Sequence, residues 1–139
     1  MRKYVIRALR SIGAVTAGYA VIALCTTLGF EVLLGGIGYY KSSAGVLLAG
    51  GVVAILSGLA GGLTAAWLGG RARVWHAAGT LVWLSIDTAV VLSRGGQDPV
   101  WFDLGGSLTL MASAVAGGLL YRSLERPGLL VGRDRNAHG

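Results

Sequence analysis

Long stretches without a charged residue constrain the fold of this chain more than any other feature of its sequence. In 139 residues, four stretches contain no Asp, Glu, Lys or Arg: 11–30, 42–70, 74–86 and 104–121. A helix needs about 20 mostly apolar residues to cross a bilayer, and in lipid its backbone groups must bond within the helix. We therefore predict an all-α integral membrane protein with a single domain, residues 1–139. Its four transmembrane helices are expected at residues 12–34, 46–68, 74–93 and 104–121.

The remaining charged residues are distributed unequally between the two sides of the expected membrane. If the N-terminus lies in the cytoplasm, ten of the twelve Lys and Arg residues fall on that side, and Lys41 and Arg94 fall on the other. This excess over short loops is the positive-inside pattern. It predicts that both termini are cytoplasmic, with residues 127–139 as a tail. Arginines that face anionic lipid also account for the net charge of +6, so no nucleic-acid partner is expected.

Small residues recur every four positions along the second and fourth predicted spans. Residues four apart share one face of a helix, and small side chains let two helices approach closely in a membrane. The rows either pack the four helices of this chain together, or offer part of their surface to a copy of the chain or another membrane subunit. The residues expected to pack are Gly50, Ala54, Gly58, Gly62 and Ala66 in the second span and Gly105, Ser113 and Gly117 in the fourth.

The same two spans match each other when the sequence is shifted by 56 residues. LAGGVVAILSGLAGGL, residues 48–63, then lies over LGGSLTLMASAVAGGL, residues 104–119, and Glu31 falls on Asp87. The match is compatible with two tandem helical hairpins related as a parallel repeat. A chance match between two Gly/Ala-rich helices is the alternative.

Two carboxylates, Asp87 and Glu31, lie within the predicted spans. An aspartate at the centre of a transmembrane helix costs about 2.5–3.5 kcal/mol on insertion scales, so such residues are usually turned toward the bundle interior. Asp87 shares its helix face with Trp83 and Thr80, and this polar stripe should face the interior. Glu31 lies nearer the outer interface, on a face with Thr27.

These residues permit a functional and a structural hypothesis. In the functional hypothesis, an outer-half pocket binds a proton, a cation or a basic ligand. In the structural hypothesis, Asp87 makes a hydrogen bond or an ion pair between helices. The candidate ligand-binding residues are Asp87, Glu31, Thr27, Thr80 and Trp83.

The sequence contains no recognisable metal-binding or catalytic pattern. Its His and Cys residues, His76, His138 and Cys25, are too widely separated in the sequence to indicate a metal site. No Gly-x-Ser-x-Gly motif for a nucleophile is present. We therefore expect no metal, no cofactor and no enzymatic activity.

Together these features predict a small non-enzymatic, multi-pass membrane protein that acts as an accessory or assembly subunit and packs through its Gly/Ala-rich helix faces. Its expected partners are the lipid bilayer and either another membrane subunit or further copies of itself. The alternative is a small proton- or cation-coupled transporter or channel that uses Asp87 with Glu31. A composition rich in Ala, Gly, Leu, Val and Arg is compatible with a bacterial gene, and hence with the inner cell membrane.

Overall fold

The computed structural model describes residues 2–70, 73–95 and 98–124, and within these ranges the chain is helical, with no strand. The prediction of an all-α protein with four helices long and apolar enough to cross a membrane is confirmed, and the chain has the make-up of a multi-pass membrane protein. A π-helical turn, η1 (Leu28–Leu33), follows the first helix. The four helices are α1 (Arg2–Thr27), α2 (Ala44–Gly69), α3 (Arg73–Ser93) and α4 (Val100–Leu124).

All four helices begin before the predicted spans, α3 by a single residue, because charged and polar residues can continue a helix beyond its apolar part. α4 begins at Val100, and Asp103 lies in its first turn, where an acidic side chain is favourable at the positive end of the helix dipole. α2 begins at Ala44, after Ser43, whose side chain accepts a hydrogen bond from the backbone of Val46 at 3.4 Å. The predicted tail, residues 127–139, lies outside the described residues.

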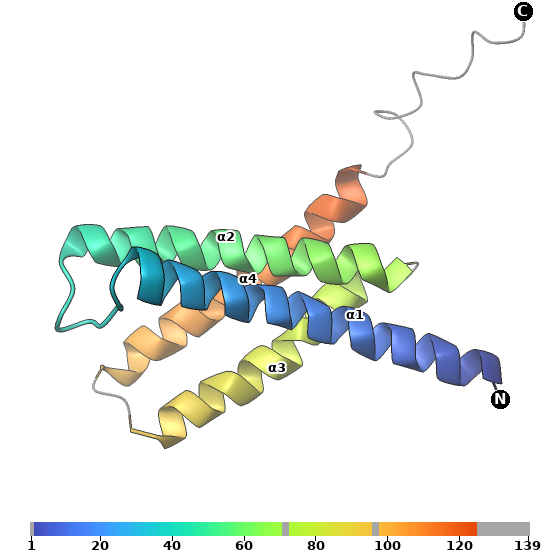
Figure 1. The fold of residues 1–139 in the computed structure, drawn as a ribbon, viewed down its shortest axis with the longest axis horizontal. Helices are drawn as coiled ribbons and strands as arrows, with labels where there is room; N and C mark the ends of the chain where they lie inside the picture. Colours follow the sequence, from blue (N-terminus) through green and yellow to red (C-terminus); the bar gives the residue numbers. More distant parts are fainter. Residues whose placement is uncertain (1, 71–72, 96–97, 125–139) are drawn as a thin grey trace, which may run out of the picture.

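The four helices form two hairpins that cross each other. Figure 1 shows α1 alongside α2, with the α3–α4 hairpin crossing them at an angle. We call the end of the bundle where α1 and α3 begin and α2 and α4 end the N-terminal end, and the opposite end the far end. At the far end the two connecting loops meet, since the backbone N–H of Tyr39 donates to Asp98 Oδ1 at 2.8 Å. The Tyr39 ring also lies 5.0 Å from the ring of Trp101, centroid to centroid.

α2 is the central helix of the bundle and contacts the other three. Its backbone approaches α4 so closely that a Cβ added to Gly58 would lie 2.8 Å from the carbonyl oxygen of Leu110. A Cβ on Gly18 of α1 would lie 2.8 Å from the carbonyl oxygen of Gly61. Around this crossing, Ile22, Leu84 and Ala114 form a small buried cluster from α1, α3 and α4. The core of the bundle therefore consists largely of backbone and small side chains.

Most of the residues singled out for helix packing are buried, but they do not share one neighbour. Gly62 faces the backbone of Ala114 in α4, whereas Gly50 faces the side chain of Ile37 in the loop before α2. Gly105 is exposed and has no atom within 4 Å of the position that its Cβ would take. The buried members are Gly50, Ala54, Gly58, Gly62 and Ala66 in α2 and Ser113 and Gly117 in α4.

Candidate functional site

Asp87 lies on an exposed face of α3, well inside the apolar part of the helix. It precedes Ser93, the last residue of α3, by six residues, which corresponds to roughly 9 Å along the helix axis. Its carboxylate is exposed, and no described residue gives it a hydrogen bond or an ion pair. Trp83, Ile86 and Val90 are also exposed. Trp83 and Val90 share a face with Asp87, because they lie four before and three after it, and Ile86 lies beside them, three after Trp83 and four before Val90. We refer to Trp83, Ile86, Asp87 and Val90 as the Asp87 face.

The polar stripe of α3 divides into a buried and an exposed half. Thr80 is fully buried, as expected, but Trp83 is 40% exposed and Asp87 is exposed. The contacts of α3 with α1 explain the difference, because they include His76 with Ser11 and Thr80 with Gly18, in the half of α3 nearer the N-terminal end. Toward the far end the two helices diverge, as Figure 1 shows. The expectation that the whole stripe faces the interior therefore fails for Trp83 and Asp87.

An aromatic pair from two helices lies beside Asp87. The rings of Tyr19 in α1 and Trp83 in α3 are stacked, with centroids 5.9 Å apart and an angle of 27° between their planes. Asp87 follows Trp83 by four residues in α3, so it lies one turn away on the helix face that carries the Trp83 ring. Sequence reasoning did not single out Tyr19. The available signal was its position in the middle of an apolar span, away from the membrane surface where tyrosines gather.

Glu31 lies in a different setting, at the far end of the bundle. It belongs to the π-helical turn η1, a geometry that occurs frequently at functional sites. Its exposed side chain lines a polar depression that also includes Lys41, Ser42 and Gly36. A Cβ added to Gly36 would lie 3.8 Å from Glu31 Oε2, so the loop after η1 runs close to the carboxylate. One acid and one base thus share a depression at the far end of the bundle.

The structure does not bring the two predicted acids together. Asp87 lies one turn from Trp83, whose ring stacks on Tyr19, and Tyr19 precedes Glu31 by twelve residues, or roughly 18 Å along α1 and η1. Thr27 is exposed on α1. Thr80 is buried, and its hydroxyl donates to the carbonyl oxygen of Ala77 in its own helix at 2.6 Å. The five candidate residues therefore occupy at least two separate regions.

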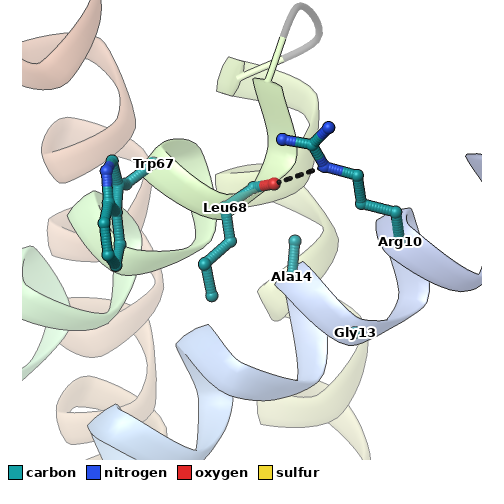
Figure 2. A pocket seen from close by; sticks show the side chains of 5 residues that line it. All are labelled: Arg10, Gly13, Ala14, Trp67 and Leu68. Atoms are coloured by element: carbon teal, nitrogen blue, oxygen red, sulfur yellow. Dashed lines mark hydrogen bonds between the residues drawn. The ribbon is translucent and has the colours of Figure 1, made fainter.

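A hydrogen bond between an arginine side chain and a second helix lies at the N-terminal end of the bundle, and the sequence did not predict it. Nε of Arg10 donates to the backbone carbonyl of Leu68 at 3.2 Å, across a cavity between α1 and the end of α2 (Figure 2). Sequence spacing alone cannot predict this contact, because the two residues are 58 positions apart.

The described residues offer no ready metal centre, since no three His, Cys, Asp or Glu side chains in those ranges gather closely enough to hold an ion.

No known protein family, curated protein or solved structure matches this chain. Its function is therefore inferred from its own geometry.

Proposed function

We propose that this chain is a small non-enzymatic membrane subunit, without metal or cofactor, that binds another membrane polypeptide through the Asp87 face. The exposure of Asp87 within the apolar part of α3 is the observation that carries the proposal. A charged side chain costs about 2.5–3.5 kcal/mol at the centre of a spanning helix, and less toward its ends. A hydrogen-bond donor on a neighbouring helix lowers that cost, because polar groups bond across helices in membranes.

The rest of the Asp87 face supports a helix as the occupant. Ile86 is 51% exposed and Val90 is 39% exposed, so apolar side chains flank the acid along one side of α3. A partner helix can pack its own apolar side chains against them and place a Lys, Arg or amide opposite Asp87. The apolar contacts would contribute packing, and the acid would fix the register of the two helices.

The small-residue surface open to a partner is narrower than the sequence suggested. The row in α2 is occupied by other parts of this chain, and so are Ser113 and Gly117 in α4. Gly105 and Gly106 remain open, with no atom within 4 Å of their Cβ positions, and Ala112 and Ala116 are exposed on the same helix. These residues of α4 are the part of the Gly/Ala-rich surface that supports contact with a second chain.

The proposed environment is the inner cell membrane of a bacterium. The distribution of ten Lys and Arg residues on one side and two on the other supports cytoplasmic termini. The pairing of α1 with α2 and of α3 with α4 supports two helical hairpins, whether or not they arose by duplication.

The test is gentle solubilisation of the tagged full-length chain from its native membrane, with measurement of mass and partner stoichiometry. Asp87→Leu should reduce the retained partner by at least tenfold while leaving the melting temperature of the chain unchanged, because Leu tolerates lipid. Ser85→Leu is the matched control: Ser85 is also exposed on α3, but it lies on another side of the helix. Recovery of the chain alone, or only as a homo-oligomer, would contradict the proposal, as would full partner retention by Asp87→Leu.

A second candidate function is the transport of a cation or proton, and one observation favours it. The stacked rings of Tyr19 and Trp83, one helical turn from Asp87, offer the combination of aromatic faces and negative charge that attracts an organic cation. Glu31 is too far along α1 to complete the same site. In proteoliposomes, Asp87→Asn should abolish proton- or cation-dependent flux, and undiminished flux would remove Asp87 from such a mechanism.

A further inference from the structure

A cavity of about 430 Å³ lies between α1 and the last turns of α2, at the N-terminal end of the bundle. It is separate from the Asp87 face and from the depression that Glu31 lines. Figure 2 shows Arg10, Gly13 and Ala14 approaching it from α1, and Trp67 and Leu68 from α2. It combines one cation with an otherwise apolar or small-residue lining.

One nitrogen of the Arg10 side chain holds it in place, and the two terminal nitrogens remain to bind a ligand. Nε donates to the carbonyl oxygen of Leu68, in the last turn of α2, where a cation is favourable at the negative end of the helix dipole. In Figure 2 the two terminal nitrogens point away from Leu68. The backbone passes near them at Gly70, whose Cβ position would lie 3.5 Å from Nη2. The four N–H groups on those nitrogens form the fork that binds phosphate oxygens in pairs.

The lining of the cavity suits the part of a lipid that lies just below its headgroup. Gly13 has open space where its Cβ would lie, so α1 presents bare backbone beside the cation. Trp67 is 64% exposed, and its indole ring, with an apolar body and one polar edge, suits the membrane interface. A molecule with a phosphate, a glycerol and acyl chains can therefore place its phosphate against the cation. Its glycerol and upper acyl chains can then lie against the bare backbone and the indole ring.

Charge favours an anionic occupant at this end of the bundle. Arg10 lies at the N-terminal end and lines the cavity. The acidic residues in the described ranges all lie in the half of the bundle nearer the far end: Glu31, Asp87, Asp98 and Asp103. No described carboxylate is therefore close enough to neutralise Arg10.

We propose that this cavity binds one anionic phospholipid of the leaflet at the N-terminal end. The lipid phosphate accepts hydrogen bonds from the terminal nitrogens of Arg10. The glycerol and the first methylene groups lie over Gly13 and Ala14, against the Trp67 ring. Specificity for an anionic lipid follows from the positive charge of Arg10, because a zwitterionic lipid brings its own cation toward this arginine.

The experiment measures lipid bound per chain by native mass spectrometry of the delipidated full-length protein, titrated with phosphatidylglycerol or phosphatidylcholine. The unaltered chain should bind phosphatidylglycerol about tenfold more tightly than phosphatidylcholine, because the choline cation of the second lipid is repelled by Arg10. Arg10→Gln should remove that preference. Arg122→Gln is the matched control, since Arg122 is an exposed arginine at the same end that does not line the cavity, and it should keep the preference.

A second variant tests the cavity without touching the arginine. Gly13→Leu fills the open space and leaves the Arg10–Leu68 hydrogen bond in place, so it should weaken phosphatidylglycerol binding about tenfold at an unchanged melting temperature. Unchanged binding in this variant would overturn the proposal. Equal losses in Arg10→Gln and Arg122→Gln would also overturn it, because they would indicate diffuse surface charge. Complete displacement of the lipid by excess inorganic phosphate would do so as well, because it would indicate a site for a small anion.

Discussion

Replacement of Gly62 by alanine is the most direct test of how closely α2 and α4 pack. A Cβ added to Gly62 overlaps the carbonyl oxygen of Ala114 and would lie 2.7 Å from the carbonyl carbon. Ordinary contact begins near 3.4 Å, which is about 0.7 Å beyond the distance to the carbonyl carbon. Because the carbonyl oxygen is closer still, the helices must separate locally by more than this to accept one methyl group. A side chain could rotate away from this contact, but the backbone of α4 cannot.

Two opposing contributions set the size of the effect. Overpacking a well-packed core typically costs about 1–3 kcal/mol, and separated helices also lose dispersion contacts along the crossing. Alanine is a better helix former than glycine by about 0.5–1 kcal/mol, which offsets part of that cost. Because Gly58 and Gly117 make similarly close contacts at the same crossing, the separation cannot stay confined to Gly62. We therefore expect Gly62→Ala to lower the free energy of unfolding by about 1–2 kcal/mol.

The assay is reversible unfolding of the full chain in mixed micelles by titration with a denaturing detergent. Gly51→Ala is the control, since Gly51 is in the same helix but is exposed and has no atom within 4 Å of its Cβ position. That variant should be unchanged or stabilised by up to about 1 kcal/mol. If Gly62→Ala were as stable as Gly51→Ala, the close approach of α2 to α4 would be refuted.

Two further substitutions test contacts on either side of this crossing. Thr80→Val should change the free energy of unfolding by less than about 1 kcal/mol, because the buried hydroxyl donates to Ala77 in its own helix; a loss of several kcal/mol would instead indicate a bond between helices. Asp98→Ala should cost about 1 kcal/mol by removing the acceptor for the Tyr39 N–H, as measured by the same titration. An unaltered midpoint would show that the two loops do not hold each other.

The helices could be predicted because a membrane leaves the backbone few alternatives. Long apolar stretches in lipid can satisfy their peptide groups only as helices. Charge spacing therefore located three of the helices, and α3 followed because the sequence stays apolar on both sides of Asp87. The position of Asp87 six residues before the end of α3 also followed from counting residues. The exact helix ends could not be predicted, because Arg7, Arg10 and Asp103 are charged and nevertheless helical.

The direction in which Asp87 faces could not be predicted, because it depends on the angle between two helices. Spacing correctly grouped Thr80 with Asp87 on one stripe of α3. α1 covers the stripe at Thr80, where Gly18 lies against it, and then diverges, so the same stripe is buried at one point and exposed two turns later. The stacking of Tyr19 on Trp83 and the bond from Arg10 to Leu68 were inaccessible for a related reason, since each joins residues far apart in the chain.

The divergence of α1 and α3 also separates the two proposed interactions. Near the N-terminal end, His76 is bonded to Ser11 at 3.0 Å and Gly18 packs against Thr80, so α1 and α3 are in direct contact there. Asp87 follows Arg73, at the start of α3, by fourteen residues, or roughly 21 Å along the axis. A lipid on Arg10 and a partner helix on the Asp87 face would therefore not compete for space. Sites this far apart that share no contacts are expected to be energetically independent. Loss of one interaction then leaves the other in place, so a failure of the lipid proposal would say nothing against the subunit proposal.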